Sequence, residues 1–251
     1  MPTRELLVTE LGTMRYAEAL GLQRAVAQAR ISGAIEQDVL LLVEHPHVVT
    51  LGRSAKGKTL TASPELLAAR GVESFEVDRG GDVTYHGPGQ LVGYPILDLR
   101  RHRQDLHWYL RQVEEALIVA LRALRIEGRR HAGYTGVWVG EGEVGAPTPT
   151  LRKIASIGVH ARDWVTWHGF ALNVVTDLSY FDLMIPCGIA GVTMTSLQRE
   201  LARAEDGDAP TASDLTSQAS SAVVRAAGEV FSLEPIEVSL PSLLEQTATA
   251  A

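Results

Sequence analysis

A single cysteine, Cys187, stands between Pro186 and Gly188 in the run DLMIPCGIAGVTMTS, which spans residues 182–196. One thiol cannot form an internal disulfide and is too few for a thiolate zinc site, so any sulfur chemistry here uses one thiol. Free cysteine is often a small buried packing residue, whereas flanking Pro and Gly favour an exposed, turned backbone. A nucleophile at this position needs a nearby cation or imidazole, because at a pKa of about 8.5 only a few per cent of a thiol is thiolate at neutral pH.

Lysine is scarce in this chain. Lys56, Lys58 and Lys153 are the only lysines among 23 basic residues, and the others are arginines. A lysine can give up its proton at a working pH and an arginine cannot, so a lysine in an arginine-rich chain hints at proton transfer. Lys153 opens the strand-like run KIASIGV, where spacing alone favours a lysine in solvent at the end of a strand.

A glycine-rich stretch, RGGDVTYHGPGQ at 79–90, combines four glycines with the polar side chains of Arg79, Thr84 and His86. Glycine lets a backbone turn sharply or approach a ligand closely, and the polar groups supply hydrogen-bond donors. The spacing matches neither a GxGxxG motif nor a Walker loop. It fits a tight hairpin or a substrate loop, and three polar groups of distinct chemistry on one turn favour the substrate loop.

Histidines are the other residues that could hold a ligand. His45 and His47 form an H-x-H pair on a strand-like segment, and His160 and His168 follow later. Side chains two apart on a strand share a face, but the pair has no carboxylate partner at the spacing of a metal site. We therefore expect hydrogen-bonded structural or substrate-contacting histidines and no bound metal.

The elements that must position these residues are indicated by periodicity and capping signals. Asp105 and Ser63 are expected to begin helices, and hairpin-like spacings prevail over regular βαβ alternation. We expect an α+β fold with a mixed or antiparallel sheet flanked by helices. Helices are predicted at 14–31 (with Thr13 as N-cap), 63–71, 106–125 and 213–230, and strands at 39–44, 47–53, twice within 75–99, and at 135–140, 153–159, 163–168, 169–175 and 236–240.

Composition narrows the classes of protein. The 251 residues are 45% hydrophobic, enough for one sizeable core, and we expect a single domain over 1–235 followed by a strand and fraying tail over 236–251. No run reaches the roughly 18 to 20 apolar residues of a membrane span, and charges interrupt the N-terminus, so we expect a cytoplasmic protein without membrane contact. A net charge of −7 argues against nucleic acid as a partner, and we expect a monomer.

Four blocks of sequence occur in one order: RGGDVTYHGPGQLVGYP at 79–95, RKIASIGVH at 152–160, HGFALNV at 168–174 and IPCGI at 185–189. Together they resemble the lipoyl (octanoyl) transferase family, whose members have the biotin/lipoyl protein ligase fold. The resemblance runs from about residue 38 to about residue 200, and its most specific part is the first block.

The resemblance implies a catalytic acyltransferase domain that moves an octanoyl or lipoyl group from octanoyl-acyl carrier protein to a lysine of a lipoyl domain, the first step in making the lipoate cofactor on protein. The implied acceptors are lipoyl domains of 2-oxoacid dehydrogenase E2 subunits and the glycine cleavage H protein, and no cofactor is implied. By position in the motifs, Cys187 matches the acyl-thioester nucleophile and Lys153 the lysine that lowers its pKa. The implied substrate-binding residues are Arg79, Gly80, Gly81, Asp82, Val83, Thr84, Tyr85, His86, Ser156, Ile157, Gly158, Gly169, Phe170 and Ala171.

The chemistry of these residue types agrees with such a relay. Thiolate attack exchanges one thioester for another at nearly equal free energy, and transfer to an amine is downhill, so no ATP is required. An ammonium on Lys153 would favour the thiolate. Once the acyl-enzyme has formed, Lys153 could release its proton and then accept one from the attacking amine, which an arginine could not. We expect Tyr85, Leu91 and Val92 to line the octanoyl slot.

Two alternatives stay open at the level of sequence. An ATP-dependent lipoate or biotin ligase of the same fold has no use for Cys187, and GRSAKGK at 52–58 only faintly resembles an adenylate loop. A non-catalytic module that binds acyl carrier or lipoyl domains needs no nucleophile. Both protein partners are expected to be acidic, and the basic residues that could steer them, or simply form a solvated face, are Arg100, Arg101, Arg103, Arg129 and Arg130.

Overall fold

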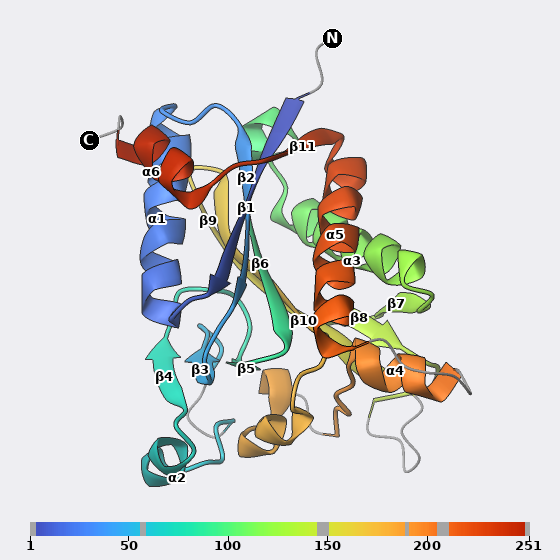
Figure 1. Ribbon diagram of the computed structural model, residues 1–251. Helices are drawn as coiled ribbons and strands as arrows, with labels where there is room; N and C mark the ends of the chain where they lie inside the picture. The colour runs from blue at the N-terminus through green and yellow to red at the C-terminus, as the bar shows by residue number, and fades with distance from the viewer. Residues whose placement is uncertain (1–3, 56–58, 145–150, 189–190, 205–210, 249–251) are drawn as a thin grey trace.

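An eight-stranded sheet forms the centre of the computed structural model, which describes residues 4–55, 59–144, 151–188, 191–204 and 211–248 (Figure 1). Its strand order is β11-β1-β2-β6-β10-β9-β8-β7. β1 runs parallel to β2 and β11 and the other neighbours are antiparallel, so the sheet is mixed, as predicted. The strands are β1 Arg4–Thr13, β2 Asp38–Glu44, β6 Gln90–Ile96, β7 Gly128–His131, β8 Tyr134–Val139, β9 Arg152–Arg162, β10 Val165–Asn173 and β11 Leu233–Glu237.

Helices cover both faces of this sheet (Figure 1). α1 (Tyr16–Ser32) and α6 (Leu240–Ala248) lie on one face, and α3 (Leu106–Ala123) and α5 (Ala212–Phe231) lie on the other. Because successive side chains of a strand point to opposite faces, each strand feeds both cores. The arrangement confirms the α+β class.

The alternation is plain on β2, which lies inside the sheet. Leu40 and Leu42 belong to the core under α3 and α5, whereas Val39 and Leu41 belong to the core under α1. A strand buried on both faces has a continuous apolar sequence, and the run VLLLV predicts such a strand.

The predicted capping residues are confirmed at two helices. Asp105 at the start of α3 accepts hydrogen bonds from two backbone N–H groups of the first turn, at 2.9 and 3.0 Å, and Ser63 caps α2 (Pro64–Ala69). Each such cap contributes about 1 kcal/mol. α1 begins differently from the prediction, since its N-cap position is Arg15 rather than Thr13 and has no side-chain cap.

A second, three-stranded sheet carries the glycine-rich stretch. Its order is β4-β3-β5, and its apolar side packs against the segment that leads to the cysteine. The elements are β3 Val48–Leu51, β4 Glu73–Glu76, β5 Val83–His86 and two 3₁₀ helices, η2 Leu178–Leu183 and η3 Pro186–Gly188. A short helix, α4 (Leu197–Ala204), follows.

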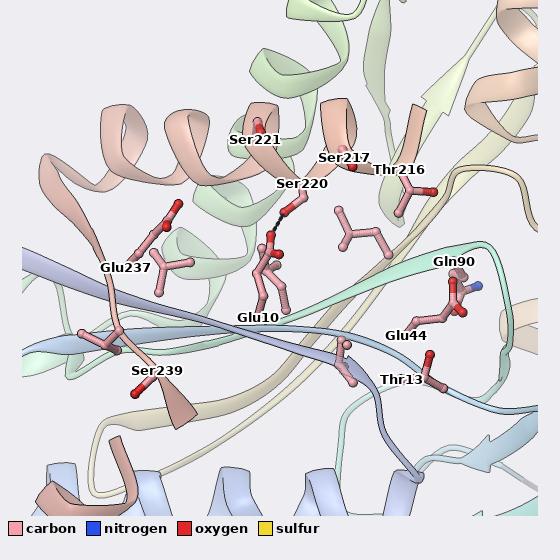
Figure 2. A pocket seen from close by; sticks show the side chains of 16 residues that line it. Glu10, Thr13, Glu44, Gln90, Thr216, Ser217, Ser220, Ser221, Glu237 and Ser239 are labelled. Atoms are coloured by element: carbon pink, nitrogen blue, oxygen red, sulfur yellow. Dashed lines mark hydrogen bonds between the residues drawn. The ribbon is translucent and has the colours of Figure 1, made fainter. Parts of the chain in front are cut away.

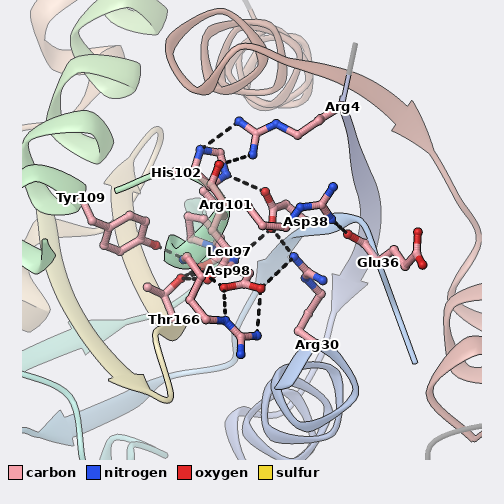
Figure 3. Close-up of polar contacts among 12 residues, drawn as sticks. Arg4, Arg30, Glu36, Asp38, Leu97, Asp98, Arg101, His102, Tyr109 and Thr166 are labelled. Atoms are coloured by element: carbon pink, nitrogen blue, oxygen red, sulfur yellow. Dashed lines mark hydrogen bonds and ion pairs between the residues drawn. The ribbon is translucent and has the colours of Figure 1, made fainter. Parts of the chain in front are cut away.

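A buried cluster of ion pairs joins α1 to β2 and to the turn after β6 (Figure 3). Arg30 Nη2 lies 2.9 Å from Asp38 Oδ1 and 3.9 Å from Asp98 Oδ2. His102 Nε2 lies 2.7 Å from Asp38 Oδ2. The side chains of Arg30 and Asp38 are only 3% and 4% exposed, so removing either partner would leave a buried charge unpaired.

Several features differ from the sequence prediction. No strand is predicted for residues 4–13, which form β1 between β2 and β11. The two strands predicted at 163–168 and 169–175 form a single strand, β10. The predicted strand at 236–240 is β11, which begins earlier and continues the sheet beside β1.

The expected fraying tail is also corrected, because it contains α6. Leu243 of this helix is fully buried in the core under α1, and such burial stabilises a helix this short. Within the described ranges, none of the helices is both long and apolar enough to cross a membrane.

Candidate active site

A small pocket lies where the smaller sheet meets β6, β9 and β10. Its cavity volume is about 30 Å³, close to that of one water molecule. Parts of all three predicted substrate-binding segments line it, so folding brings together residues that are far apart in the sequence. The lining consists of Tyr16, Arg79, Thr84, His86, Val92, Tyr94, Ser156, Ile157, Gly158, His168, Gly169, Phe170 and Ala171.

Strand pairing aligns two of the predicted segments with each other. Gly158 on β9 lies opposite Gly169 on β10, and across the other edge of β10 Phe170 lies opposite Gly93 of β6. A Cβ atom at Gly93 would overlap the Phe170 ring, and one at Gly169 would overlap the Gly93 carbonyl oxygen. Glycine at both positions therefore lets the aromatic ring lie across β6 and form one wall of the pocket.

Backbone carbonyl groups hold Arg79 at the start of the glycine-rich loop. Its Nη2 donates to the carbonyl oxygen of Thr50 at 2.8 Å, and its Nη1 donates to that of Gly80 at 3.0 Å. The Gly80 N–H in turn donates to the Val159 carbonyl oxygen at 2.8 Å. A Cβ at Gly158 would come within 2.9 Å of the Gly80 carbonyl oxygen, so the loop packs directly on the backbone of β9.

Only one face of β5 reaches the pocket. Thr84 and His86 line it, whereas Val83 and Tyr85 are fully buried in the apolar cluster of the smaller sheet. This is the period-two alternation of a strand. The structure thus places Val83 and Tyr85 behind the pocket lining rather than in it.

The same alternation on β6 sorts the residues expected in the octanoyl slot. Val92 lines the pocket as predicted, and Tyr94, two positions on, lines it too. Leu91 points the other way, into the core under α3 and α5. Of the loop residues, Gly80 and Gly81 also lie outside the lining and serve to hold the backbone of the loop.

Two buried histidines line the pocket as neutral rings. Burial lowers the pKa of His86 to about 3. Burial also lowers the pKa of His168 to about 4, although its Nε2 donates to the Asp78 carboxylate at 2.8 Å. Both rings are therefore uncharged at neutral pH and can act as hydrogen-bond partners for a ligand.

The earlier histidine pair is hydrogen-bonded, as expected. His45 Nδ1 donates to the Met14 carbonyl oxygen at 2.7 Å, and its Nε2 accepts from the Tyr94 hydroxyl at 2.7 Å. His47 Nδ1 lies 2.7 Å from the Tyr85 hydroxyl. Both nitrogens of His45 are thus hydrogen-bonded, and its Nε2 orients the hydroxyl of Tyr94, a residue of the pocket.

Sequence reasoning missed Tyr16 and Tyr94 as pocket residues, and it left open whether His168 contacts substrate or is structural. His168 opens the block HGFALNV, and Tyr94 shares a strand face with Val92, so motif position and alternation could have found them. Tyr16 opens α1 and comes from a distant part of the chain. No local pattern signals its place in the pocket.

Lys153 is buried rather than solvated. It is 1% exposed, and its Nζ lies 5.3 Å from the centroid of the Trp138 ring. Its backbone N–H donates to the Thr193 carbonyl oxygen at 2.8 Å, and its carbonyl oxygen accepts from the Thr195 N–H at 2.9 Å. The interpretation as a strand-end lysine in solvent is therefore wrong. Burying a lysine costs free energy, which the rest of the fold must offset.

Cys187 is the central residue of η3, and its side chain lies outside the described part of the structure. The turn itself is well held: the Gly188 N–H donates to the Ile185 carbonyl oxygen at 2.9 Å, and the Ile185 N–H donates to that of Thr59 at 2.7 Å. Gly188 has a φ of +67°, and a Cβ there would come within 2.5 Å of Asp82 Oδ2. Asp82 therefore supports the cysteine turn from the glycine-rich loop instead of lining the pocket.

A cationic groove of about 360 Å³ adjoins the pocket at the His168–Asp78 pair. Arg24, Arg162 and His160 line it together with Asp78. At its edge, Arg53 Nη2 lies 2.6 Å from His160 Nδ1, and no carboxylate of the described chain pairs with this guanidinium. Its chemistry suits an anionic group.

The arginines that could steer protein partners also have acceptors within this chain. Arg101 donates to the Glu36 carbonyl oxygen, and the others lie within ion-pair distance of carboxylates. These pairs are Arg100–Asp98, Arg103–Asp105, Arg129–Glu141, Arg130–Glu114 and Arg130–Glu115.

A larger hollow of about 840 Å³ lies between β1, β2 and β6 on one side and α5 on the other (Figure 2). Glu10, Glu44 and Glu237 give it a negative lining, and Ser220 donates to Glu10. Of the residues expected to contact substrate, Leu91 alone is among its described lining. The smaller pocket, beside the glycine-rich loop, is therefore the candidate active site.

Solved lipoate protein ligases share this fold. A bi-partite lipoate protein ligase from Thermoplasma acidophilum, studied with its E2 lipoyl domain, matches with a TM-score of 0.66 at 16% identity, covering 98% of this chain and 91% of that one. Lipoate-protein ligase A bound with ATP gives a TM-score of 0.65 at 17% identity, covering 98% and 93%. These likenesses confirm the predicted biotin/lipoyl protein ligase fold.

The chain belongs to the lipoyl protein ligase A/B catalytic domain family, whose model matches residues 15–216. Octanoyltransferase from Acidobacterium capsulatum is 52% identical over 203 residues, which are 78% of this chain and 80% of that protein. Octanoyltransferase from Solibacter usitatus is 51% identical over 186 residues, 74% and 80% of the two chains. These relatives confirm the predicted family and the predicted class of enzyme, an acyltransferase.

Proposed function

We propose that this protein transfers an octanoyl group from acyl carrier protein to a lysine of a lipoyl domain through an acyl-thioester on Cys187, within one catalytic domain over 1–235. Octanoyl transfer is the activity that the relatives carry in their names. The observation that carries the cysteine route is the burial of Lys153, whose backbone pairs with residues 193–195, a few positions after Cys187.

The reaction proceeds in two exchanges. The Cys187 thiolate attacks the carbonyl carbon of the octanoyl thioester, and the carrier leaves as its own thiolate, so one thioester replaces another. The lysine amine then attacks the acyl-enzyme, an amide forms, and the Cys187 thiolate leaves. In the first step an ammonium on Lys153 favours the Cys187 thiolate and then gives one proton to the departing carrier thiolate. In the second step the neutral Lys153 amine accepts the proton that the acceptor amine gives up.

Apolar residues of the pocket supply the slot for the acyl chain. Val92, Ile157 and Phe170 give it hydrocarbon walls, and each buried methylene contributes about 0.8 kcal/mol. Phe170 is the largest side chain in that wall.

The cationic groove supports an anionic donor. Arg24 lies 3.7 Å from Asp78 and Arg162 lies 3.6 Å from Asp163, whereas Arg53 beside the groove has no carboxylate partner among the described residues. Acyl carrier protein delivers its acyl group on a phosphopantetheine arm, whose phosphate is an anion. We propose that this phosphate passes along the groove while the thioester reaches Cys187.

The acceptors follow from the same proposal. They are lipoyl domains of 2-oxoacid dehydrogenase E2 subunits and the glycine cleavage H protein, modified on one lysine each. The T. acidophilum ligase was studied with its own E2 lipoyl domain, and this chain shares only the fold of that ligase. A monomeric, cytoplasmic enzyme without a cofactor fits this role and stays a prediction.

An ATP-dependent ligase is the nearest rival function. A protein of this fold binds ATP, so the fold does not separate ligase from transferase. The relatives that are about half identical over most of both chains are named octanoyltransferases, which favours transfer. The burial of Lys153 argues against a non-catalytic module that only binds acyl carrier or lipoyl domains. Such a module has no use for a costly buried lysine.

Intact-mass spectrometry tests the proposal directly. The protein is mixed with octanoyl-acyl carrier protein in the absence of ATP and acceptor, and we expect an octanoyl adduct on Cys187 that hydroxylamine removes. Cys187→Ser should form no hydroxylamine-sensitive adduct. Strict dependence of acyl transfer on ATP and free octanoate would contradict the proposal, and unchanged transfer by Cys187→Ser would contradict the cysteine route.

A further inference from the structure

A chain of side-chain amides runs from the pocket to the segment beside Lys153. His86 Nδ1 lies 2.9 Å from Gln90 Oε1, Gln90 Nε2 lies 2.9 Å from Asn173 Oδ1, and Asn173 Nδ2 lies 2.9 Å from the Thr195 carbonyl oxygen. Gln90 and Asn173 are 2% and 1% exposed. Two buried amides placed end to end in this way need an explanation, because each is costly to bury unless fully hydrogen-bonded.

The direction of every hydrogen bond in the chain is fixed by backbone carbonyl groups. The Thr195 carbonyl oxygen can only accept, so Asn173 faces it with its NH₂ group and presents Oδ1 to Gln90. Gln90 then donates through Nε2 to Asn173, and the same Nε2 donates to the Tyr85 carbonyl oxygen at 3.2 Å. Gln90 Oε1 is left to face His86, and an amide oxygen can only accept.

The protonation state of His86 follows. Its Nδ1 must carry the proton that it donates to Gln90 Oε1. Because burial keeps the ring uncharged at neutral pH, Nε2 then carries a lone pair. His86 lines the pocket, and none of the described residues makes a hydrogen bond to its Nε2. The amide chain thus presents one acceptor nitrogen to whatever binds.

The other end of the chain touches the catalytic segment. Thr195, whose carbonyl oxygen holds Asn173, donates its own N–H to the Lys153 carbonyl oxygen at 2.9 Å. One continuous set of hydrogen bonds therefore fixes both the pocket histidine and the backbone of Lys153. It includes the bond between Gln90 and Asn173, which are 83 positions apart in the sequence.

We propose that Gln90 and Asn173 are positioning residues that hold His86 as its Nδ1–H tautomer, so that Nε2 accepts a hydrogen bond from an N–H group of a substrate. In the proposed octanoyl transfer, on which this inference rests for its substrates, two N–H groups qualify: the attacking lysine amine and the amides of the pantetheine arm. They belong to different half-reactions, which separates them experimentally.

Side-chain ¹⁵N NMR of the histidines reads the tautomer without any assay of activity. His86 resonances are assigned by their loss in His86→Gln. In the wild-type protein we expect a protonated Nδ1 and an unprotonated Nε2. Gln90→Glu keeps an acceptor oxygen toward Nδ1 and should keep this tautomer, whereas Gln90→Met removes the acceptor and should give a mixture of tautomers.

Kinetics of the two half-reactions complete the test. Loss of one oriented hydrogen bond should slow one half-reaction about tenfold in Gln90→Met, and in Asn173→Asp, where a carboxylate replaces the NH₂ donor. A slower transfer step identifies the lysine amine, and slower acyl-enzyme formation identifies the pantetheine amide. Gln218→Met, an exposed glutamine on α5, is the matched control and should change neither step nor tautomer.

The inference is overturned if wild-type His86 carries its proton on Nε2, or if Gln90→Met leaves both tautomer and rates unchanged. Equal slowing of both half-reactions with a lowered melting temperature would show a purely structural role and would also overturn it. Failure of the proposed function is a different result: the wild-type protein would form no octanoyl adduct, while the NMR spectra would still report the tautomer.

Discussion

Lys153 Nζ lies 5.3 Å from the centre of the Trp138 ring. At 1% exposure the side chain is shielded from bulk water, and the face of the Trp138 ring attracts its positive charge. Gly136 completes the enclosure, since a Cβ atom there would come within 2.7 Å of Lys153 Cε. Trp138 and Gly136 thus fix the position of the Lys153 side chain.

Lys153→Arg should separate the electrostatic role of Lys153 from its proton-transfer role. The guanidinium keeps the positive charge but cannot release a proton, so we expect partial acyl-enzyme formation and a loss of at least about 100-fold in transfer to the amine. Rapid-quench mass spectrometry measures both steps, and a melting curve checks the fold. Equal losses in the two steps would instead indicate crowding against Gly136 and would contradict the proton-transfer role.

Arg53→Ala tests the cationic groove as the path of the carrier's phosphate. Because Arg53 has no carboxylate partner among the described residues, we expect its loss to raise the KM for octanoyl-acyl carrier protein about three- to tenfold and to weaken the salt dependence of KM. The KM for octanoyl-pantetheine, which lacks the phosphate, should not change. Arg122→Ala, an exposed arginine on α3, is the control. Equal effects on both donors would contradict a phosphate contact.

Phe170→Leu tests the wall of the acyl slot. The ring lies across Gly93, and a smaller side chain leaves space for a longer acyl chain. We expect the ratio of kcat/KM for decanoyl over octanoyl donors to rise roughly fourfold for each methylene that becomes buried. Phe231→Leu removes a comparable buried ring from the core under α3 and α5, so it should lower stability without changing this ratio. An unchanged ratio in Phe170→Leu would remove Phe170 from the slot.

Much of the fold could be predicted because its signals are local. Asp105 and Ser63 begin helices through contacts within one turn, and these caps were predictable from residue type and position. The motif blocks likewise located most of the pocket, since Arg79, His86 and Phe170 lie inside them.

The remainder depends on contacts between distant parts of the chain. β1 has no turn or cap of its own. It becomes a strand by pairing with β2 and with β11, the second of which lies more than 200 residues further along the chain. Alternation on β5, once its register is known, places Tyr85 behind the pocket instead of inside it. The hydrogen bond between Gln90 and Asn173 joins two motif blocks across 83 positions, which no spacing rule encodes.

Asp38→Asn tests the ion-pair cluster that holds α1 on the sheet. Burial raises the pKa of the Asp38 carboxyl, but hydrogen bonds from His102 and from the Asp98 N–H, with the charge of Arg30, outweigh it and hold the pKa below its usual value. Removing the charge leaves Arg30 buried without its nearest partner, so we expect a loss of about 3 kcal/mol in the free energy of unfolding at pH 7, measured in urea.

The same cluster predicts how stability depends on pH. A lowered pKa means that the unfolded chain binds the proton more readily, so the stability that the carboxylate contributes is complete above the unfolded pKa of about 4 and is lost as pH falls through the folded value. The difference between the wild type and Asp38→Asn should therefore shrink below about pH 4. Asp163→Asn breaks the exposed pair with Arg162, 3.6 Å away, and should change stability by no more than about 0.5 kcal/mol at any pH. A wild-type advantage that stays constant down to acid pH would show that Asp38 contributes through packing and not through its charge.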